Sequence, residues 1–386
     1  KTAALVTPDR SLARRVAAEL LRWNIVINDS AGRPLGNTPP GLFCRLIART
    51  FADDCAPLPL LSMLKHPLAA GGIGLGAFRS NVRKLEMQVL RGLRPASGLI
   101  GILDELRTEC RTRLIEEWFL SFCEMARPFE KIMASKDRYS PSKIIQAHLT
   151  LAESLAATNE ESGIQRLWTG DAGATAAEFF STIIDAEGLD PMLPSDYPDF
   201  LDAMFSGQTV RSRFGTHPRL NIWGLLEARL QNADLVCLGG LNEGSWPNES
   251  NADPWMSRPM REAFGLSPFE RRIGLSAHDF AQGFCAEEVL LTRSQKVDGS
   301  PTVPSRWLLM LETQLRVGEP TNAKKWDVEI RRRGKKLACW QLGIDRPLKI
   351  EAGPPPEPRP PVIYRPRKLS VTAIETWRRD PYSIFA

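Results

Sequence analysis

The residues with the clearest chemical potential lie in the second half of the chain, and two of them are aromatic. Trp246 and Trp255 flank a polar loop, and exposed indole rings there would stack on unpaired bases for about 1–3 kcal/mol each. The alternative is that both rings pack the loop onto its own domain. The sequence supports the two interpretations equally, so single-stranded nucleic acid is one candidate ligand of this loop.

Basic side chains form two further groups that could contact nucleic-acid phosphates. Arg271 and Arg272 lie on a predicted helix, where pairing with Glu262 or Glu270 is favoured over phosphate contact because exposed ion pairs are common. The denser group lies in residues 324–336, and its phosphate-binding candidates are Lys324, Lys325, Arg331, Arg332 and Arg333. Binding several phosphates would make the DNA affinity of this group fall steeply with salt. A solvated face is the equally supported alternative.

Metal ligands and catalytic pairs are sparse. The seven cysteines form no Cys-x-x-Cys pair and the four histidines show no ligand spacing, so no metal site is predicted. His278 precedes Asp279 as in a catalytic pair, but neighbours on a helix point to different faces. A packing or capping role is therefore favoured for His278, and no catalytic residue is assigned.

The sequence predicts no phosphate-binding loop for a nucleotide. The chain contains no Gly-x-x-x-x-Gly-Lys-Ser/Thr sequence, which would surround Mg-nucleotide with backbone N–H groups and a lysine. The glycine-rich run at residues 71–76 has no Lys-Ser/Thr after it, so it is interpreted as a turn between helices.

The elements that must position these residues alternate between α/β and all-helical patterns. A strand is predicted over residues 3–6, followed by a helix with Pro8 in its first position and a second strand over residues 25–27. Strand patterns return at 220–223, 233–238 and 289–292, and a helix is predicted around 307–311. Long amphipathic patterns from about residue 58 to 207 predict helices. The predicted fold is an α/β domain split by a helical insertion.

Composition bounds the class of protein. The net charge of +5 permits a polyanionic partner without requiring one. No apolar stretch approaches the ~20 residues that span a bilayer, and the start lacks the order of a signal peptide. Together with the scattered cysteines, these features predict a cytoplasmic protein. Because the chain begins with Lys and stops soon after a new helix begins, we expect it to be a piece of something longer.

Two segments resemble motifs of UvrD-like superfamily 1 helicases. Residues 236–247, VCLGGLNEGSWP, are similar to the strand-and-loop pattern V-x-x-x-G-(L/M)-(N/E)-(E/D)-G-x-(F/W)-P, and the motif residues are Asn242, Glu243, Gly244 and Pro247. Residues 269–281, FERRIGLSAHDFA, resemble the sixth helicase motif, roughly E-R-R-L-x-Y-V-x-x-T-R-A. Residues 4–9 look like the fourth motif, after which these proteins insert a helical 2B subdomain.

The departures from these motifs carry information. The arginine that would reach the terminal phosphate of the nucleotide aligns with Phe280, directly after His278 and Asp279. A phenyl ring cannot act as an arginine finger. Residues 221–229 also depart from the fifth motif. Residues 369–382 resemble the start of a RecB-type nuclease domain, with Asp380 where an iron–sulfur cysteine often stands, and the nuclease residues would follow Ala386.

The resemblance implies a division of the chain into parts of a helicase and a nuclease. A RecA-like (helicase 2A) domain would occupy residues 1–57 and 208–344, and a mainly α-helical 2B-like insertion would occupy residues 58–207. Residues 345–367 are rich in proline and are predicted to be a semi-rigid linker. Residues 368–386 would begin the RecB-type nuclease domain.

The combined pattern is similar to the AddB-type subunits of helicase-nucleases. It implies a DNA-handling, non-motor part of an AddAB-type ATP-dependent enzyme that resects double-strand breaks for recombinational repair. The implied partners are single-stranded DNA, duplex ends and an AddA-like subunit. ATP with Mg²⁺ and the nuclease metal are expected only in the full complex. Two alternatives stay open: the second lobe of an active superfamily 1 helicase, and a platform for protein–protein contacts.

Overall fold

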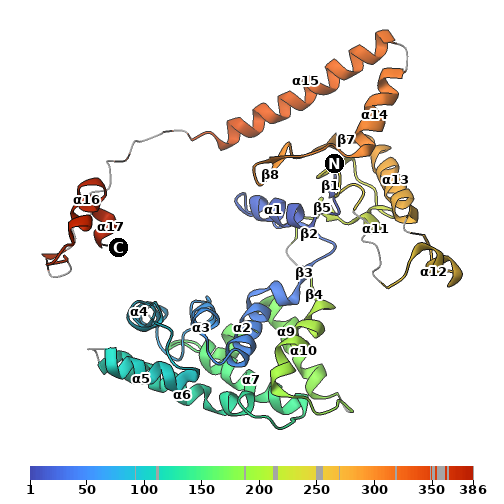
Figure 1. Ribbon diagram of the computed structural model, residues 1–386. Helices are drawn as coiled ribbons and strands as arrows, with labels where there is room; N and C mark the ends of the chain where they lie inside the picture. Colours follow the sequence, from blue (N-terminus) through green and yellow to red (C-terminus); the bar gives the residue numbers. More distant parts are fainter. Residues whose placement is uncertain are drawn as a thin grey trace. The chain divides into compact units, whose positions relative to one another are not determined.

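A parallel sheet and a block of helices are the main features of the computed structural model (Figure 1). The structure describes the chain except residues 92, 110–112, 187, 212–215, 249–254, 269, 318–319, 348, 350–352, 354–360, 363–364 and 386. The described residues fall into two units, Lys1–Met310 and Leu311–Ala386. No helix among the described residues combines the length and the apolar character that crossing a bilayer requires.

The sheet of the first unit has five parallel strands in the order β2-β5-β1-β6-β7. These strands are β1 (Ala3–Val6), β2 (Asn28–Asp29), β5 (Leu220–Trp223), β6 (Leu235–Leu238) and β7 (Glu288–Leu291). In the central strand, Ala3 lies opposite both Leu220 and Leu235. The prediction of an α/β fold is therefore confirmed, although the strand expected at residues 25–27 begins later, at Asn28.

Helices join the strands and cover the sheet. α1 (Arg10–Leu21) begins after Asp9, whose Oδ1 accepts hydrogen bonds from the backbone N–H groups of Ser11 at 2.8 Å and Leu12 at 3.1 Å. Asp9 is thus the N-cap, and the prediction of Pro8 in the first helical position was wrong. α13 (Glu270–Phe284) connects β6 to β7 and packs on β6: a β-carbon on Gly283 would lie 2.8 Å from Leu238 Cδ2.

One apolar core lies between the sheet and its helices. Alternate strand residues contribute to it, as the two-residue period of a strand requires, and its buried members are Ala4, Val6, Trp223, Val236, Leu238, Leu241, Trp246, Phe280 and Trp307. Trp307 belongs to α14 (Arg306–Val317), which matches the helix predicted around residues 307–311. This α/β core is distinct from the core of the helical block.

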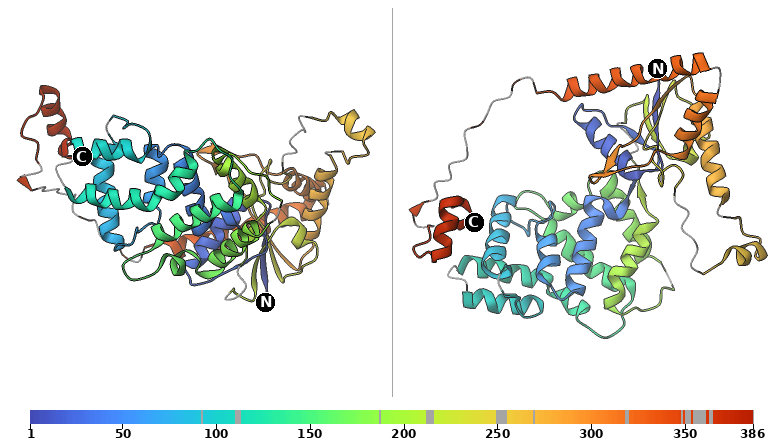
Figure 2. Two further views of the ribbon diagram at one scale, coloured as in Figure 1. Left: turned by 90° about the horizontal axis from the view of Figure 1, so that it is seen from below. Right: turned by 45° about the horizontal axis from the view of Figure 1, so that its top comes forward.

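The helical block lies between β2 and β5 in the sequence, and its helices stay together in both views of Figure 2. It contains α2 (Pro39–Ala52), α3 (Pro57–Leu64), α4 (Leu75–Leu85), the π-helical turn η2 (Glu86–Leu90), α5 (Gly98–Glu109), α6 (Arg113–Met133), α7 (Pro141–Ala156), α8 (Gly163–Leu167), α9 (Gly170–Ile184) and α10 (Tyr197–Ser206). Where the chain enters and leaves the block, β3 (Arg33–Pro34) pairs antiparallel with β4 (Thr209–Val210).

The helical block starts earlier than residue 58. Phe43, Ile47 and Phe51 of α2 are buried in the same core as Phe119 of α6 and Ile145 of α7. The two-residue ladder of β3 and β4 closes the block before α2 and after α10. The boundary predicted between residues 57 and 58 therefore falls inside the helical core, because helical periodicity does not tell which core a helix joins.

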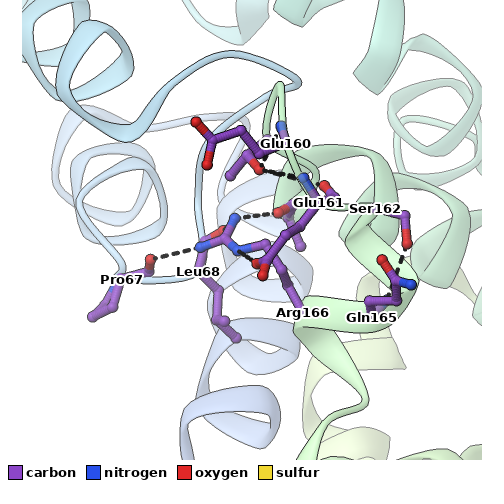
Figure 3. Close-up of polar contacts among 9 residues, drawn as sticks. Pro67, Leu68, Glu160, Glu161, Ser162, Gln165 and Arg166 are labelled. Atoms are coloured by element: carbon purple, nitrogen blue, oxygen red, sulfur yellow. Dashed lines mark hydrogen bonds and ion pairs between the residues drawn. The ribbon is translucent and has the colours of Figure 1, made fainter.

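Arg166 of α8 connects three chain segments of the helical block by hydrogen bonds (Figure 3). Its guanidinium donates to the carbonyls of Leu68 at 3.2 Å and Pro67 at 3.4 Å, and also to the carbonyl of Ala156 at the end of α7. Carbonyls at a helix end lack partners within the helix, and this side chain supplies a donor for that of Ala156 while also binding the loop after α3.

A buried histidine makes the stability of the helical block depend on pH. His148 of α7 has no exposed surface, and its Nδ1 lies 2.7 Å from Tyr197 Oη. Burial lowers the pKa of His148 to about 3 and that of His66 to about 4. In the unfolded chain these imidazoles take up protons near pH ~6.5, whereas in the folded chain they stay neutral. The contribution of the two histidines to the free energy of unfolding is therefore fully present above that pH and is lost as the pH falls towards 4.

We expect His148→Gln to reduce this pH dependence. Between pH 6 and 5, the free energy of unfolding of the variant should fall less steeply than that of the native chain, by about 1.4 kcal/mol per pH unit. Urea unfolding at a series of pH values measures the slope. His278→Gln is the control, because that ring is 69% exposed. An unchanged slope in His148→Gln would show that His148 is not the group responsible.

The second unit contains α15 (Pro320–Asp345), α16 (Val371–Arg379) and α17 (Pro381–Phe385). Ser370 caps α16 by accepting a hydrogen bond from the backbone N–H of Ala373 at 3.1 Å, which agrees with the helix predicted at this point. Most of the proline-rich segment predicted as a linker lies outside the described residues.

Candidate nucleic-acid interface

The carboxyl ends of β1 and β6 lie side by side, and the chain leaves them in opposite directions. It runs from β1 through α1 to β2 at one edge of the sheet, and from β6 through α13 to β7 at the other. α/β proteins commonly place ligands at such a switch in strand order. The turn after β6 is tight: a β-carbon on Gly239 would lie 2.6 Å from Leu5 Cδ1, and Gly240 has a φ of +74°.

The side chain of Trp246 packs inside the α/β core at this end of the sheet. Its side chain is completely buried, and its Nε1–H donates to the carbonyl of Gly239 at 3.0 Å. Its ring meets that of Phe280 edge-on, with the ring centres 6.3 Å apart. The proposed stacking of Trp246 on bases is therefore wrong for this conformation, because no face of the indole ring reaches solvent. The packing interpretation applies.

The acidic residue of the same loop ties it to α14. Glu243 accepts hydrogen bonds from Arg306 Nε at 2.9 Å and from the backbone N–H of Arg306 at 3.1 Å. These bonds hold the pKa of Glu243 below its ordinary value. Ser305 adds a second link, since its Oγ donates to the carbonyl of Trp246 at 2.6 Å. Glu243 is thus a structural anchor at the first turn of α14.

The remaining motif residues shape the loop. The carbonyl of Asn242 accepts hydrogen bonds from the backbone N–H groups of Ser245 at 3.1 Å and Trp246 at 2.9 Å. Gly244 has a φ of +87°, a conformation that favours glycine. Pro247 follows a cis peptide bond and is buried. The motif of residues 242–247 therefore forms a compact turn, held by its own backbone and by the bonds to Gly239, Ser305 and Arg306.

Three consecutive residues of α13 have three different environments. His278 is exposed, so the predicted packing or capping role was wrong. Asp279 is 4% exposed and accepts two hydrogen bonds from Arg229, with Nε–Oδ1 at 2.6 Å and Nη2–Oδ2 at 3.0 Å. Phe280 is buried in the α/β core, stacked on Phe284 with the ring centres 5.9 Å apart.

The pair of Arg229 and Asp279 was not predicted from the sequence. Arg229 follows α11 (Leu225–Ala228) directly, and fifty residues separate it from Asp279. The bonds to Asp279 raise the pKa of Arg229 further. This bidentate pair joins the crossover before β6 to the helix after it.

Trp255 differs from Trp246. Its side chain is 86% exposed, so an indole face is accessible to a base or to another protein. Residues 249–254, which precede it, lie outside the described residues. Among the two tryptophans proposed to stack, Trp255 is therefore the one whose position permits this contact.

Arg271 and Arg272 lie in the first turn of α13 and are exposed. The predicted pairing with Glu270 was wrong, because Glu270 Oε1 binds Arg258 Nη2 at 2.7 Å. Arg271 Nη1 instead donates to the hydroxyl of Ser267 at 3.0 Å. In the part of the chain that the structure describes, neither Arg271 nor Arg272 forms an ion pair, with Glu262 or with any other carboxylate.

The basic run of residues 324–336 forms part of α15. Lys325 and Arg331 are exposed, whereas the side chain of Lys324 lies outside the described residues. Arg332 Nε and Arg333 Nε bind the two oxygens of Glu329 at 2.7 and 2.8 Å, and these bonds lower the pKa of Glu329 to about 2. One carboxylate shared by two guanidiniums leaves the pair of arginines with a net positive charge.

No family model matches the chain. Three uncharacterized proteins are similar to it at low identity. Those of Rickettsia bellii, Rickettsia felis and Rickettsia conorii are 22%, 24% and 24% identical, over 57%, 62% and 63% of this chain and over 25%, 26% and 26% of their own length. The chain thus spans about a quarter of the length of the curated relatives it matches.

Proposed function

We propose that this chain is a DNA-handling, non-motor part of an AddAB-type helicase-nuclease that resects double-strand breaks. In this proposal the parallel sheet is the RecA-like 2A lobe of an AddB-type subunit, and the helical block is its 2B-like insertion. An AddA-like subunit would supply the motor. ATP with Mg²⁺ and the nuclease metal would be bound elsewhere in the complex.

The observation that carries the proposal is the environment of Phe280. In the sixth helicase motif, which residues 269–281 resemble, an arginine at this position completes the nucleotide site. Here a phenyl ring occupies it, 9% exposed and packed between Trp246 and Phe284. A side chain buried in this way cannot stabilise a transferring phosphate. Phe280 thus contributes to the packing of the α/β core and not to a nucleotide site. This role favours a non-motor lobe over the second lobe of an active helicase.

The topology supports the same proposal. Strands from before and after the helical block form one sheet, with β1 between β5 and β6. A helicase lobe interrupted by a helical insertion would have this arrangement. The low-identity relatives are about four times as long as the stretch they share with this chain, a length compatible with several domains. Fold alone does not assign function, so the proposal depends on a DNA-binding test.

The test measures the affinity of the chain for a single-stranded oligonucleotide and for a forked duplex by fluorescence anisotropy, between about 50 and 200 mM salt. We expect binding that weakens steeply with salt. In Arg331→Gln/Arg332→Gln/Arg333→Gln, the slope of log affinity for single-stranded DNA against log salt should be shallower by about 2, since each phosphate contact contributes roughly 0.7.

The matched control removes three positive charges from the helical block. Arg79, Arg83 and Lys84 are exposed on α4, and their change to glutamine should leave the slope as in the native chain. Equal slopes in the α15 variant and in this control would remove α15 from the interface. If the native chain binds neither DNA at low salt, the proposed function fails and a protein–protein platform is the better explanation.

A further inference from the structure

A pocket of about 310 Å³ lies at the start of α13, and three arginines line it. Arg261 comes from α12 (Arg258–Ala263), and Arg271 and Arg272 come from the first turn of α13. The rest of the lining consists of Ser267 and Pro268, in the connection between the two helices, and Leu275. Residues from two helices and their connection thus place three guanidinium groups around one hollow.

Arg271 and Arg272 give this pocket a positive charge. Arg261 Nη2 donates to the carbonyl of Ser267 at 3.2 Å, and Arg271 Nη1 donates to the hydroxyl of the same serine at 3.0 Å. Both of these acceptors are neutral, and the bond to Ser267 orients the guanidinium of Arg271 without cancelling its charge. Glu270, the acidic residue of this helix turn, is bound to Arg258 at 2.7 Å. Arg272 has no hydrogen-bond or ion-pair partner among the described residues.

The shape and charge of the pocket fit a phosphate group. Guanidinium groups are planar and present several N–H donors that match phosphate oxygens in pairs. The amino end of α13, a helix of 15 residues, adds the favourable field of a helix N-terminus for an anion. Pro268 and Leu275, which is 42% exposed, provide an apolar wall for the sugar beside a bound phosphate.

We propose that the pocket of Arg261, Arg271 and Arg272 binds a phosphate group of single-stranded DNA. This inference rests on the proposed function, and it adds a contact separate from the basic run of α15. The phosphate is either a phosphodiester within the strand or the phosphate at its 5′ end. Both present the same oxygens to the arginines, and an experiment separates them.

The experiment compares Arg271→Gln/Arg272→Gln with the control Arg79→Gln/Arg83→Gln, which removes the same charge from α4. Each protein is titrated with one oligonucleotide sequence carrying either a 5′-phosphate or a 5′-hydroxyl. At about 0.1 M salt we expect the pocket variant to bind roughly ten-fold more weakly, with a slope of log affinity against log salt shallower by about 1. The control should bind as the native chain does. Arg271→Lys/Arg272→Lys should keep the slope and regain part of the affinity.

The two DNA ends identify the source of the phosphate. Equal affinities of the native chain for both oligonucleotides indicate a phosphodiester. A preference for the 5′-phosphate that disappears in the pocket variant indicates the strand end. Binding by the pocket variant that equals that of the control on both oligonucleotides overturns the inference, while the proposed function survives because the native chain still binds DNA.

A calorimetric titration with inorganic pyrophosphate keeps the test decisive if the native chain fails to bind DNA, which would contradict the proposed function. Heat of binding in the native chain that is lost in Arg271→Gln/Arg272→Gln would then support a phosphate pocket without DNA. Absence of heat in the native chain would overturn the pocket as well.

Discussion

Trp246→Ala is expected to lower the free energy of unfolding of the α/β core by about 3–5 kcal/mol. The side chain is completely buried, its ring packs edge-on against Phe280, and its Nε1–H satisfies the carbonyl of Gly239. Removing it leaves a cavity and an unpaired carbonyl at the carboxyl end of the sheet. Urea unfolding followed by circular dichroism measures the loss.

Two matched variants separate packing from DNA contact. Trp246→Phe keeps an aromatic ring but leaves the carbonyl of Gly239 without its donor, so it should cost about 1–3 kcal/mol. Trp255→Ala removes a ring that is 86% exposed and should change stability by about 0.5 kcal/mol or less. A stable Trp246→Ala protein that has lost affinity for single-stranded DNA would contradict the packing role and restore the stacking hypothesis.

Arg229→Met is expected to destabilise the chain by about 3–5 kcal/mol. The loss should exceed that of Asp279→Asn, for which we expect about 1.5–3 kcal/mol. The difference follows from burial: the Asp279 side chain is 4% exposed, whereas that of Arg229 is 30% exposed. Removing Arg229 leaves a buried carboxylate without its partner. Removing the carboxylate of Asp279 leaves a guanidinium that water still reaches. Chemical denaturation of both variants measures the two losses.

The double variant Arg229→Met/Asp279→Leu is the control for this pair. Replacing both charges with apolar side chains removes the stranded carboxylate, so the double variant should be more stable than Arg229→Met alone. A double variant less stable than either single variant would mean that the two residues stabilise the fold independently. Equal losses in Arg229→Met and Asp279→Asn would argue against burial as the source of the asymmetry.

Local patterns predicted the elements of the fold well. The β-branched and apolar run before Gly239 was predicted as a strand and is β6, and the amphipathic pattern around Ile145 was predicted as a helix and is α7. Such patterns record which side of an element faces apolar surroundings. They do not record which core the element joins, so α2 was assigned to the wrong part of the chain.

The environment of the motif residues could not be predicted in the same way. Ser276, Asp279 and Phe280 are buried on one side of α13, and Gly283 on the same side approaches β6. Ile273, Ala277 and Phe280 form the apolar stripe that packs on the α/β core, but this stripe does not predict that the polar side chains of Ser276 and Asp279 are buried beside it. Asp279 is buried because Arg229, fifty residues earlier, accompanies it. This partner is a property of the tertiary structure.

Ion pairs, too, could not be predicted from the local sequence. Glu270 is next to Arg271 in the sequence, yet the geometry of the first turn of α13 directs it to Arg258 on another helix. Neighbours in sequence on a helix point in different directions, so adjacency favoured the wrong ion pair. The structure thereby leaves Arg271 and Arg272 available at the pocket.

The position of β1 in the sheet has a consequence for the order of folding. Among the residues that the structure describes, Ala3 to Val6 pair with β5 and β6, more than two hundred residues later in the chain. During synthesis at about 5–20 residues per second, β1 waits on the order of tens of seconds for its partners. Both edges of β1 are therefore expected to stay unpaired on the ribosome until the second half of the sheet emerges.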